Sequence, residues 1–299
     1  MVPTPKARRS NSSNGTSMPK SPPGLGRTRS SPLNTPNFAL GMLIQMARKL
    51  LFLDVRQKAM VHIGLVTVFS LFALFFTFTL ESSFFGSLAQ KESIFNQYGV
   101  KIGWFWTLFV VGPFIFYSSK LHHKNAKSIF MDLMRLLVAT LMWYMTIQTF
   151  HWVREKTSRC DKSLMFSRDK CSEQGGHWIP GMDISGHCFL MLYSILIISE
   201  EASAFRSWNK LEVDSDVNTQ QFQLDSFVAQ CFFVLMMVLH VFWDVQIVIS
   251  CLYYHFFIDK FLGASFAIIC WYFTYGLLYP SGFLTLPINR ERRPFRTTY

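Results

Sequence analysis

Two histidines that lie far apart in the sequence give the strongest indication of chemistry. His187 follows Asp183, Ser185 and Gly186 at the start of one apolar block, and His255 follows the end of another. An imidazole in the first turn of a helix can donate a proton to a leaving oxygen near neutral pH. The free amides and partial positive charge of a helix N-terminus attract phosphate. The pattern therefore predicts phosphate chemistry, with Asp183 and Ser185 as supporting residues.

Further polar residues support this interpretation. Ser185 is suited to cap the helix that begins after it. His255 is a candidate nucleophile, and Asp259 is placed to orient its ring. His240 and Asp244 are spaced four residues apart within an apolar block, where ionisable residues are functional candidates by default. The alternative for this pair is a neutral, hydrogen-bonded contact that fixes helix packing.

The elements that must position these residues are membrane helices. Half of the 299 residues are hydrophobic, 31 are Phe, and only 16% are charged. A spanning helix needs roughly 20 apolar residues. Six blocks approach that length, which predicts an all-α membrane protein with about six transmembrane helices: 59–80, 102–119, 129–152, 185–199, 228–254 and 261–279. Lys260 falls in the loop before the sixth block, and Asp132 and Arg135 are expected to mark the interface of the third.

The distribution of charge predicts the orientation. The net charge is +11, and the first 58 residues hold ten Lys and Arg against one acid, Asp54. Basic residues also collect near the C-terminus. Since cytoplasmic segments are enriched in Lys and Arg, both termini are expected in the cytoplasm. No recognisable nucleic-acid module accompanies the basic residues, so binding to nucleic acid is not expected.

Three regions follow from these patterns. Residues 1–58 form a basic, largely disordered cytoplasmic tail, because 1–37 hold seven of the twelve prolines and few apolar residues. Within this tail, 38–53 are expected to form an interfacial helix. Residues 59–280 form a six-helix transmembrane catalytic domain, and 281–299 form a basic cytoplasmic tail.

Under this topology both histidines meet the luminal membrane face. The span that begins near His187 is short, so this residue should lie below the luminal headgroups, where a substrate with an acyl tail can reach it. Cys160 and Cys171 fall in a luminal loop, where a disulfide is chemically permitted. Two free cysteines are the alternative. No metal-ligand cluster is evident, which predicts metal-independent chemistry without a cofactor.

Several segments in the stretch from residue 60 to 280 together resemble the fat-storage-inducing transmembrane protein family. The most specific is Asp-Ile-Ser-Gly-His at 183–187; the others are 100–107, 175–178, 253–255 and 271–275 with Tyr279-Pro280. Members are described as fatty acyl-CoA diphosphatases of the endoplasmic reticulum that support lipid-droplet formation. The resemblance implies a multi-pass protein of that membrane with its active site toward the lumen.

The resemblance also implies a reaction and partners. The pyrophosphate of fatty acyl-CoA would be cleaved to acyl-4′-phosphopantetheine and adenosine 3′,5′-bisphosphate, and diacylglycerol and triacylglycerol would bind. The family's two catalytic histidines map onto His187 and His255. A non-catalytic protein that binds these two neutral lipids and partitions them into droplets is an alternative. Protein partners are not indicated.

The same histidines are similar to two motifs of lipid phosphatases of the phosphatidate-phosphatase type, which is a further alternative. In those enzymes one His protonates the leaving group and the other forms a phosphohistidine. The Asp259 assignment comes from this analogy. The phosphate-clamping arginine of that family is missing, because Val248 and Ile249 occupy the places of its Ser-Arg pair. Lys101, Arg154 and Arg159 are the candidates for supplying this charge.

Overall fold

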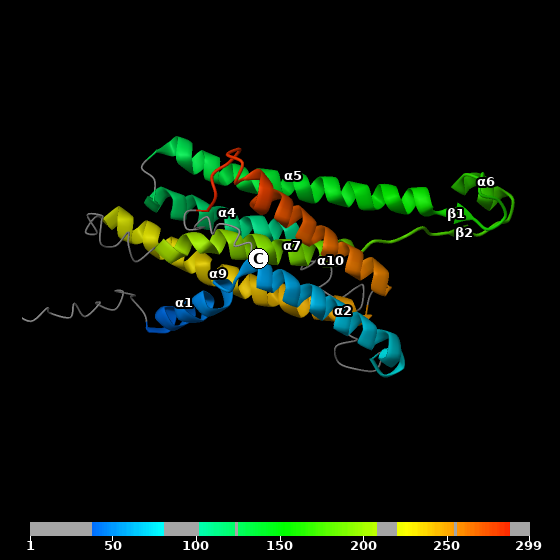
Figure 1. Ribbon diagram of the computed structural model, residues 1–299, viewed down its shortest axis with the longest axis horizontal. Helices are drawn as coiled ribbons and strands as arrows, with labels where there is room; N and C mark the ends of the chain where they lie inside the picture. The colour runs from blue at the N-terminus through cyan, green and yellow to red at the C-terminus, as the bar shows by residue number, and fades with distance from the viewer. Residues whose placement is uncertain (1–37, 81–101, 123–124, 208–219, 254–255, 288–299) are drawn as a thin grey trace, which may run out of the picture. The chain divides into compact units, whose positions relative to one another are not determined.

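The computed structural model describes residues 38–80, 102–122, 125–207, 220–253 and 256–287 (Figure 1). The predictions for 1–37 and for the C-terminal tail after residue 287 lie outside this description. The elements are helices, apart from one antiparallel pair of two-residue strands: α1 Phe38–Leu51, α2 Val55–Leu80, α4 Gly103–His122, α5 Ala126–Thr157, β1 Arg159–Cys160, α6 Arg168–Glu173, β2 Trp178–Ile179, α7 Gly186–Glu201, the 3-10 helix η2 Ala202–Ser207, α9 Gln220–Tyr253, α10 Phe257–Trp271 and the π-helix η3 Tyr272–Leu278.

The all-α membrane class is confirmed. Within the described ranges, five helical stretches are long and apolar enough to cross a bilayer: α2, α5, α7 with η2, α9, and α10 with η3. The remaining predicted block, 102–119, forms α4, which packs against α5, α7 and α9. The sixth block begins earlier than expected, since α10 starts at Phe257 and includes Lys260.

Helix α7 lies at the centre of the bundle. It contacts α2, α4, α5, α9 and α10, and every residue from Cys188 to Glu201 is buried. A helix that is apolar around its whole circumference is expected in such a place, because no face of it needs water. The ring of Tyr193 stacks on Trp104 and Phe189, with centroids 5.7 and 5.4 Å apart.

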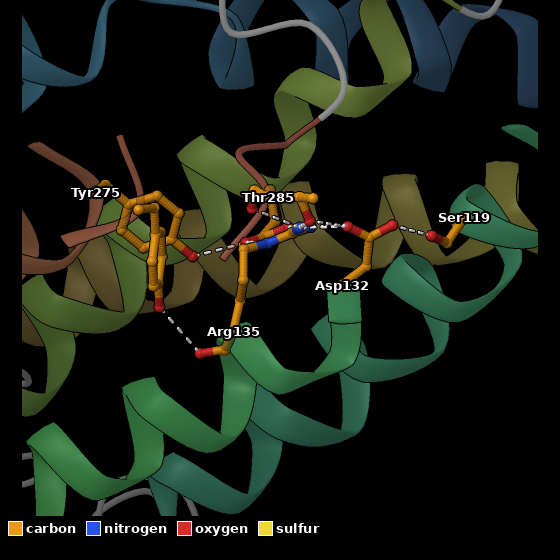
Figure 2. A network of polar contacts seen from close by, with 7 residues as sticks. Ser119, Asp132, Arg135, Tyr275 and Thr285 are labelled. Carbon is orange, nitrogen blue, oxygen red and sulfur yellow. Dashed lines mark hydrogen bonds and ion pairs between the residues drawn. The ribbon is translucent and has the colours of Figure 1, made fainter. Parts of the chain in front are cut away.

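A buried network of ion pairs lies at the C-terminal end of α7. The Arg135 guanidinium donates to both carboxylate oxygens of Glu201, at 2.9 and 2.8 Å, and to Asp132 at 2.5 Å. Tyr275 donates to Glu201 at 2.6 Å and Thr285 to Asp132 at 2.9 Å (Figure 2). Asp132 and Arg135, which the sequence analysis assigned to the membrane interface of the third span, are each only 2% exposed. They join α5 to α7, η3 and the segment after it.

A small disulfide-linked hairpin follows α5 (Figure 1). Strands β1 and β2 pair antiparallel, and a disulfide joins Cys160 to Cys171 of α6. Gly175 has a φ of 64°, a conformation that glycine adopts without strain. A Cβ at Gly176 would lie 2.9 Å from one disulfide sulfur and 3.0 Å from the other. The Gly-Gly pair thus allows the chain to turn tightly against the disulfide.

Candidate active site

The start of α7 is built from a cap and a contact with α10. The Ser185 hydroxyl accepts from the Cys188 amide at 3.3 Å, so Ser185 caps α7 as the sequence predicted. The Ser185 amide donates to the carbonyl of Asp259 at 3.1 Å. Ser185 is fully buried and Asp259 is 8% exposed. His187 lies in the first turn of α7 and is partly exposed. The structure therefore brings Ser185 and Asp259 together beside His187.

Gly263 permits this contact between α7 and α10. A Cβ at this position would lie 2.4 Å from the carbonyl oxygen of Ser185, and a backbone atom cannot rotate away. The two helices therefore approach as closely as they do because residue 263 has no side chain.

Gly263→Ala is expected to lower the free energy of unfolding by about 1–3 kcal/mol, because the methyl group forces α10 away from α7. Gly64→Ala in α2 is the matched control, since a Cβ there meets no atom within 4 Å. Alanine favours a helix over glycine by about 1 kcal/mol, so this control should be neutral or stabilising. Unfolding titrations in detergent measure both. Equal stability of the two variants would refute the close-contact argument.

Three helix ends meet at this junction. The Cys188 sulfur of α7 lies 3.7 Å from the hydroxyl of Ser250 in the last turn of α9. The Lys260 ammonium of α10 donates to the carbonyl of Cys251, also in that turn, at 2.6 Å. His255 follows α9 by two residues in the sequence and lies outside the described residues. The structure thus describes the elements on both sides of His255 and not the residue itself.

Asp183 lies beside the junction in a more open place. Its carboxylate is 3.3 Å from the guanidinium of Arg154, and these side chains are 45% and 51% exposed. Asp183 therefore pairs with the end of α5, just before the cap of α7. Exposed ion pairs of this kind contribute little to stability.

Asp244 belongs to a different cluster. It accepts from His240 at 2.9 Å and from His62 of α2 at 2.7 Å. The Lys58 ammonium is 3.3 Å from the His240 ring and donates to Ser199 at 2.8 Å. Helix geometry puts Asp244 about 14 Å from the end of α9. The cluster therefore ties α2, α7 and α9 together away from the start of α7, and sequence reasoning missed His62 and Lys58.

Among the residues that the structure describes, one group of three is close enough together to hold a metal ion: Cys160, Asp161 and Cys171. Both of its sulfurs are joined in the disulfide, so neither is a free thiolate ligand. The described residues around Ser185 and Asp259 form no such group.

These features define a multi-pass membrane protein in which polar and ionisable side chains gather where three helix ends meet. A family model described as fat storage-inducing transmembrane protein (FIT) matches residues 85–154 and 151–275. Three relatives illustrate the similarity, all named acyl-coenzyme A diphosphatase FITM2. The Caenorhabditis elegans protein is 48% identical over 266 residues, which cover 87% of this chain and 92% of the relative. The chain belongs to the fat storage-inducing transmembrane protein family.

The other two relatives are more distant. The Drosophila melanogaster protein is 29% identical over 310 residues, covering 90% of this chain and 71% of its own length. The human protein is 30% identical over 206 residues, which cover 66% of this chain and 74% of the human protein. No solved structure is significantly similar to this chain.

Proposed function

We propose that this protein is a fatty acyl-CoA diphosphatase of the endoplasmic reticulum membrane. It hydrolyses acyl-CoA to acyl-4′-phosphopantetheine and adenosine 3′,5′-bisphosphate, and it supports lipid-droplet formation. The observation that carries the proposal is the similarity to a relative named acyl-coenzyme A diphosphatase. The chain is 48% identical to that relative over 92% of the relative's length. The capped helix N-terminus at His187 supports it, because such a terminus favours a phosphate group.

The proposed mechanism uses the two histidines in sequence. A ring nitrogen of His255 attacks one phosphorus of the pyrophosphate, and the bond from that phosphorus to the bridging oxygen breaks. His187 donates its proton to the leaving oxygen. A water oxygen then attacks the phosphorus of the intermediate, the phosphorus–nitrogen bond breaks, and one water proton passes to His187, which restores both histidines. Splitting the hydrolysis this way replaces one difficult step with two easier ones.

We also place the site on the luminal side of the membrane, with diacylglycerol and triacylglycerol as further lipid ligands. The disulfide-linked hairpin supports this orientation, because disulfides persist in oxidising compartments such as the lumen. The hairpin leads directly into α7 and thus lies on the same side as His187. The basic N-terminal residues favour the cytoplasm for the opposite side.

The test is hydrolysis of oleoyl-CoA by the purified full-length protein in detergent, with adenosine 3′,5′-bisphosphate quantified. Release of this product, undiminished by a chelator, is the expected result. Phosphatidate offered in parallel tests the alternative reaction, since its consumption with no turnover of oleoyl-CoA would indicate a lipid phosphatase. Binding of diacylglycerol or triacylglycerol without hydrolysis of either substrate would indicate the non-catalytic lipid-binding alternative.

A further inference from the structure

Lys260 is a buried cation whose ammonium contacts the C-terminal end of α9. Its side chain is only 3% exposed, and its ammonium donates to the carbonyl oxygen of Cys251 at 2.6 Å. That carbonyl is one of the last four of α9, which have no amide partner within their own helix. The positive charge also suits the partial negative charge of a helix C-terminus. Lys260 therefore caps α9.

The cap leaves most of the ammonium's bonding capacity unused. A lysine ammonium has three N–H donors. In the part of the chain that the structure describes, the Cys251 carbonyl is the one hydrogen-bond acceptor of Lys260, and no carboxylate lies close enough to form an ion pair with it. A buried charge without a paired anion is costly, so this position favours an anion that brings its own oxygens.

The ammonium also lies at the junction that holds the candidate active site. Its electrostatic neighbours are Cys251, Asp259 and Cys188, the residue that follows His187. The backbone bond from Ser185 to Asp259 joins the same two helices at this level. The cation and the N-terminus of α7, with its partial positive charge, are thus gathered at one place, and both attract phosphate oxygens.

We propose that Lys260 binds the pyrophosphate of acyl-CoA through its two remaining N–H donors, and is the phosphate-clamping residue of this site. This inference rests on the proposed function. The ammonium contacts non-bridging phosphate oxygens and stabilises the negative charge that moves onto the leaving group. Its bond to the carbonyl of Cys251, the residue four positions before His255, holds the ammonium in place.

The basic residues that the sequence suggested for this role are less suitable where the structure describes them. Arg154 is half exposed and its guanidinium is 3.3 Å from the Asp183 carboxylate. Arg159 is exposed on β1, in the hairpin beyond α5. Lys101 lies outside the described residues. Lys260 is the buried cation at the junction itself.

The experiment compares Lys260→Met with Lys162→Met in the full-length protein. Lys162 is the matched control, because its ammonium also donates to a backbone carbonyl, that of Gln174 at 2.5 Å, but at an exposed site. We expect Lys260→Met to lower kcat/KM for oleoyl-CoA by about 100-fold or more, the usual effect of removing one charge-stabilising donor. Lys260→Arg should recover much of this loss, and Lys162→Met should match the wild type.

Binding of inorganic pyrophosphate separates a clamp from a helix cap. Pyrophosphate should raise the melting temperature of the wild type and of Lys162→Met, and leave that of Lys260→Met unchanged. A role confined to capping α9 would lower the melting temperature of the free variant without removing this shift. A folded Lys260→Met protein that keeps the shift and a kcat/KM within threefold of wild type would overturn the proposal.

A measurement on the wild type covers the case in which Lys260→Met does not fold. Pyridoxal 5′-phosphate followed by borohydride labels lysines in phosphate sites, and pyrophosphate should protect Lys260 but not Lys162 from this labelling. Absence of protection would overturn the proposal. If the wild type releases no adenosine 3′,5′-bisphosphate, the proposed function fails, whereas normal release with an unaffected Lys260→Met variant refutes the clamp alone.

Discussion

His187→Ala is expected to lower kcat for acyl-CoA hydrolysis by about a thousandfold, the usual contribution of a positioned proton donor. The protein should remain folded, because His187 is partly exposed and the cap of α7 comes from Ser185. His255→Ala should cost at least as much, since it removes the proposed nucleophile. Quantifying adenosine 3′,5′-bisphosphate from oleoyl-CoA measures both losses.

His151→Ala is the control for these variants. His151 is an exposed histidine of α5, so its removal tests the loss of an imidazole without touching the junction. Wild-type rates are expected for it. A His187→Ala or His255→Ala protein that elutes and melts like the wild type, and also turns over at its rate, would remove that residue from the mechanism.

A single-turnover experiment distinguishes the roles of the two histidines. An attack by His255 attaches one half of the substrate to its ring, so a peptide containing His255 should carry that added mass after an alkaline quench, where phosphorus–nitrogen bonds persist. In His187→Ala this adduct should form more slowly. Turnover in ¹⁸O-labelled water shows which product receives the oxygen and therefore which phosphorus was attacked. An adduct on His187 instead would exchange the two assignments.

The features that could be predicted from the sequence are those set by local chemistry. The apolar blocks predicted the helices because the bilayer requires about 20 apolar residues for each crossing. Ser185 could be predicted as a cap because its partner, the Cys188 amide, is three residues away. The i, i+4 pair of His240 and Asp244 was visible for the same reason.

The features that could not be predicted depend on pairs that are distant in the chain. His62 is 182 residues from Asp244, and Arg135 is 66 residues from Glu201. A single sequence gives no signal for such partners. Lys260 was placed in a loop because its charge interrupts an apolar run. In the fold its charge instead satisfies a carbonyl at the end of α9, nine residues earlier.

Arg135→Met is expected to lower the free energy of unfolding by about 3–5 kcal/mol, the usual cost of removing one partner of a buried ion pair. The methionine fills similar space, but the carboxylates of Glu201 and Asp132 then lack their cation. Each of these residues is at most 2% exposed, so water cannot replace the guanidinium. The loss should also loosen η3 and the segment after it, because Tyr275 and Thr285 bond to these same carboxylates. Unfolding titrations in mixed detergent and dodecyl sulfate measure the change.

Arg154→Met provides the comparison, because the Arg154 ion pair with Asp183 is half exposed and should contribute about 0–1 kcal/mol. Adding Glu201→Gln to Arg135→Met should restore part of the lost stability, since the amide carries no charge that requires a cation. Recovery in the double variant would show that the orphaned carboxylate causes the instability, whereas a further loss would show that Glu201 matters mainly as an acceptor for Tyr275. An Arg135→Met protein as stable as Arg154→Met would mean that the network positions α5, α7 and η3 without stabilising the fold.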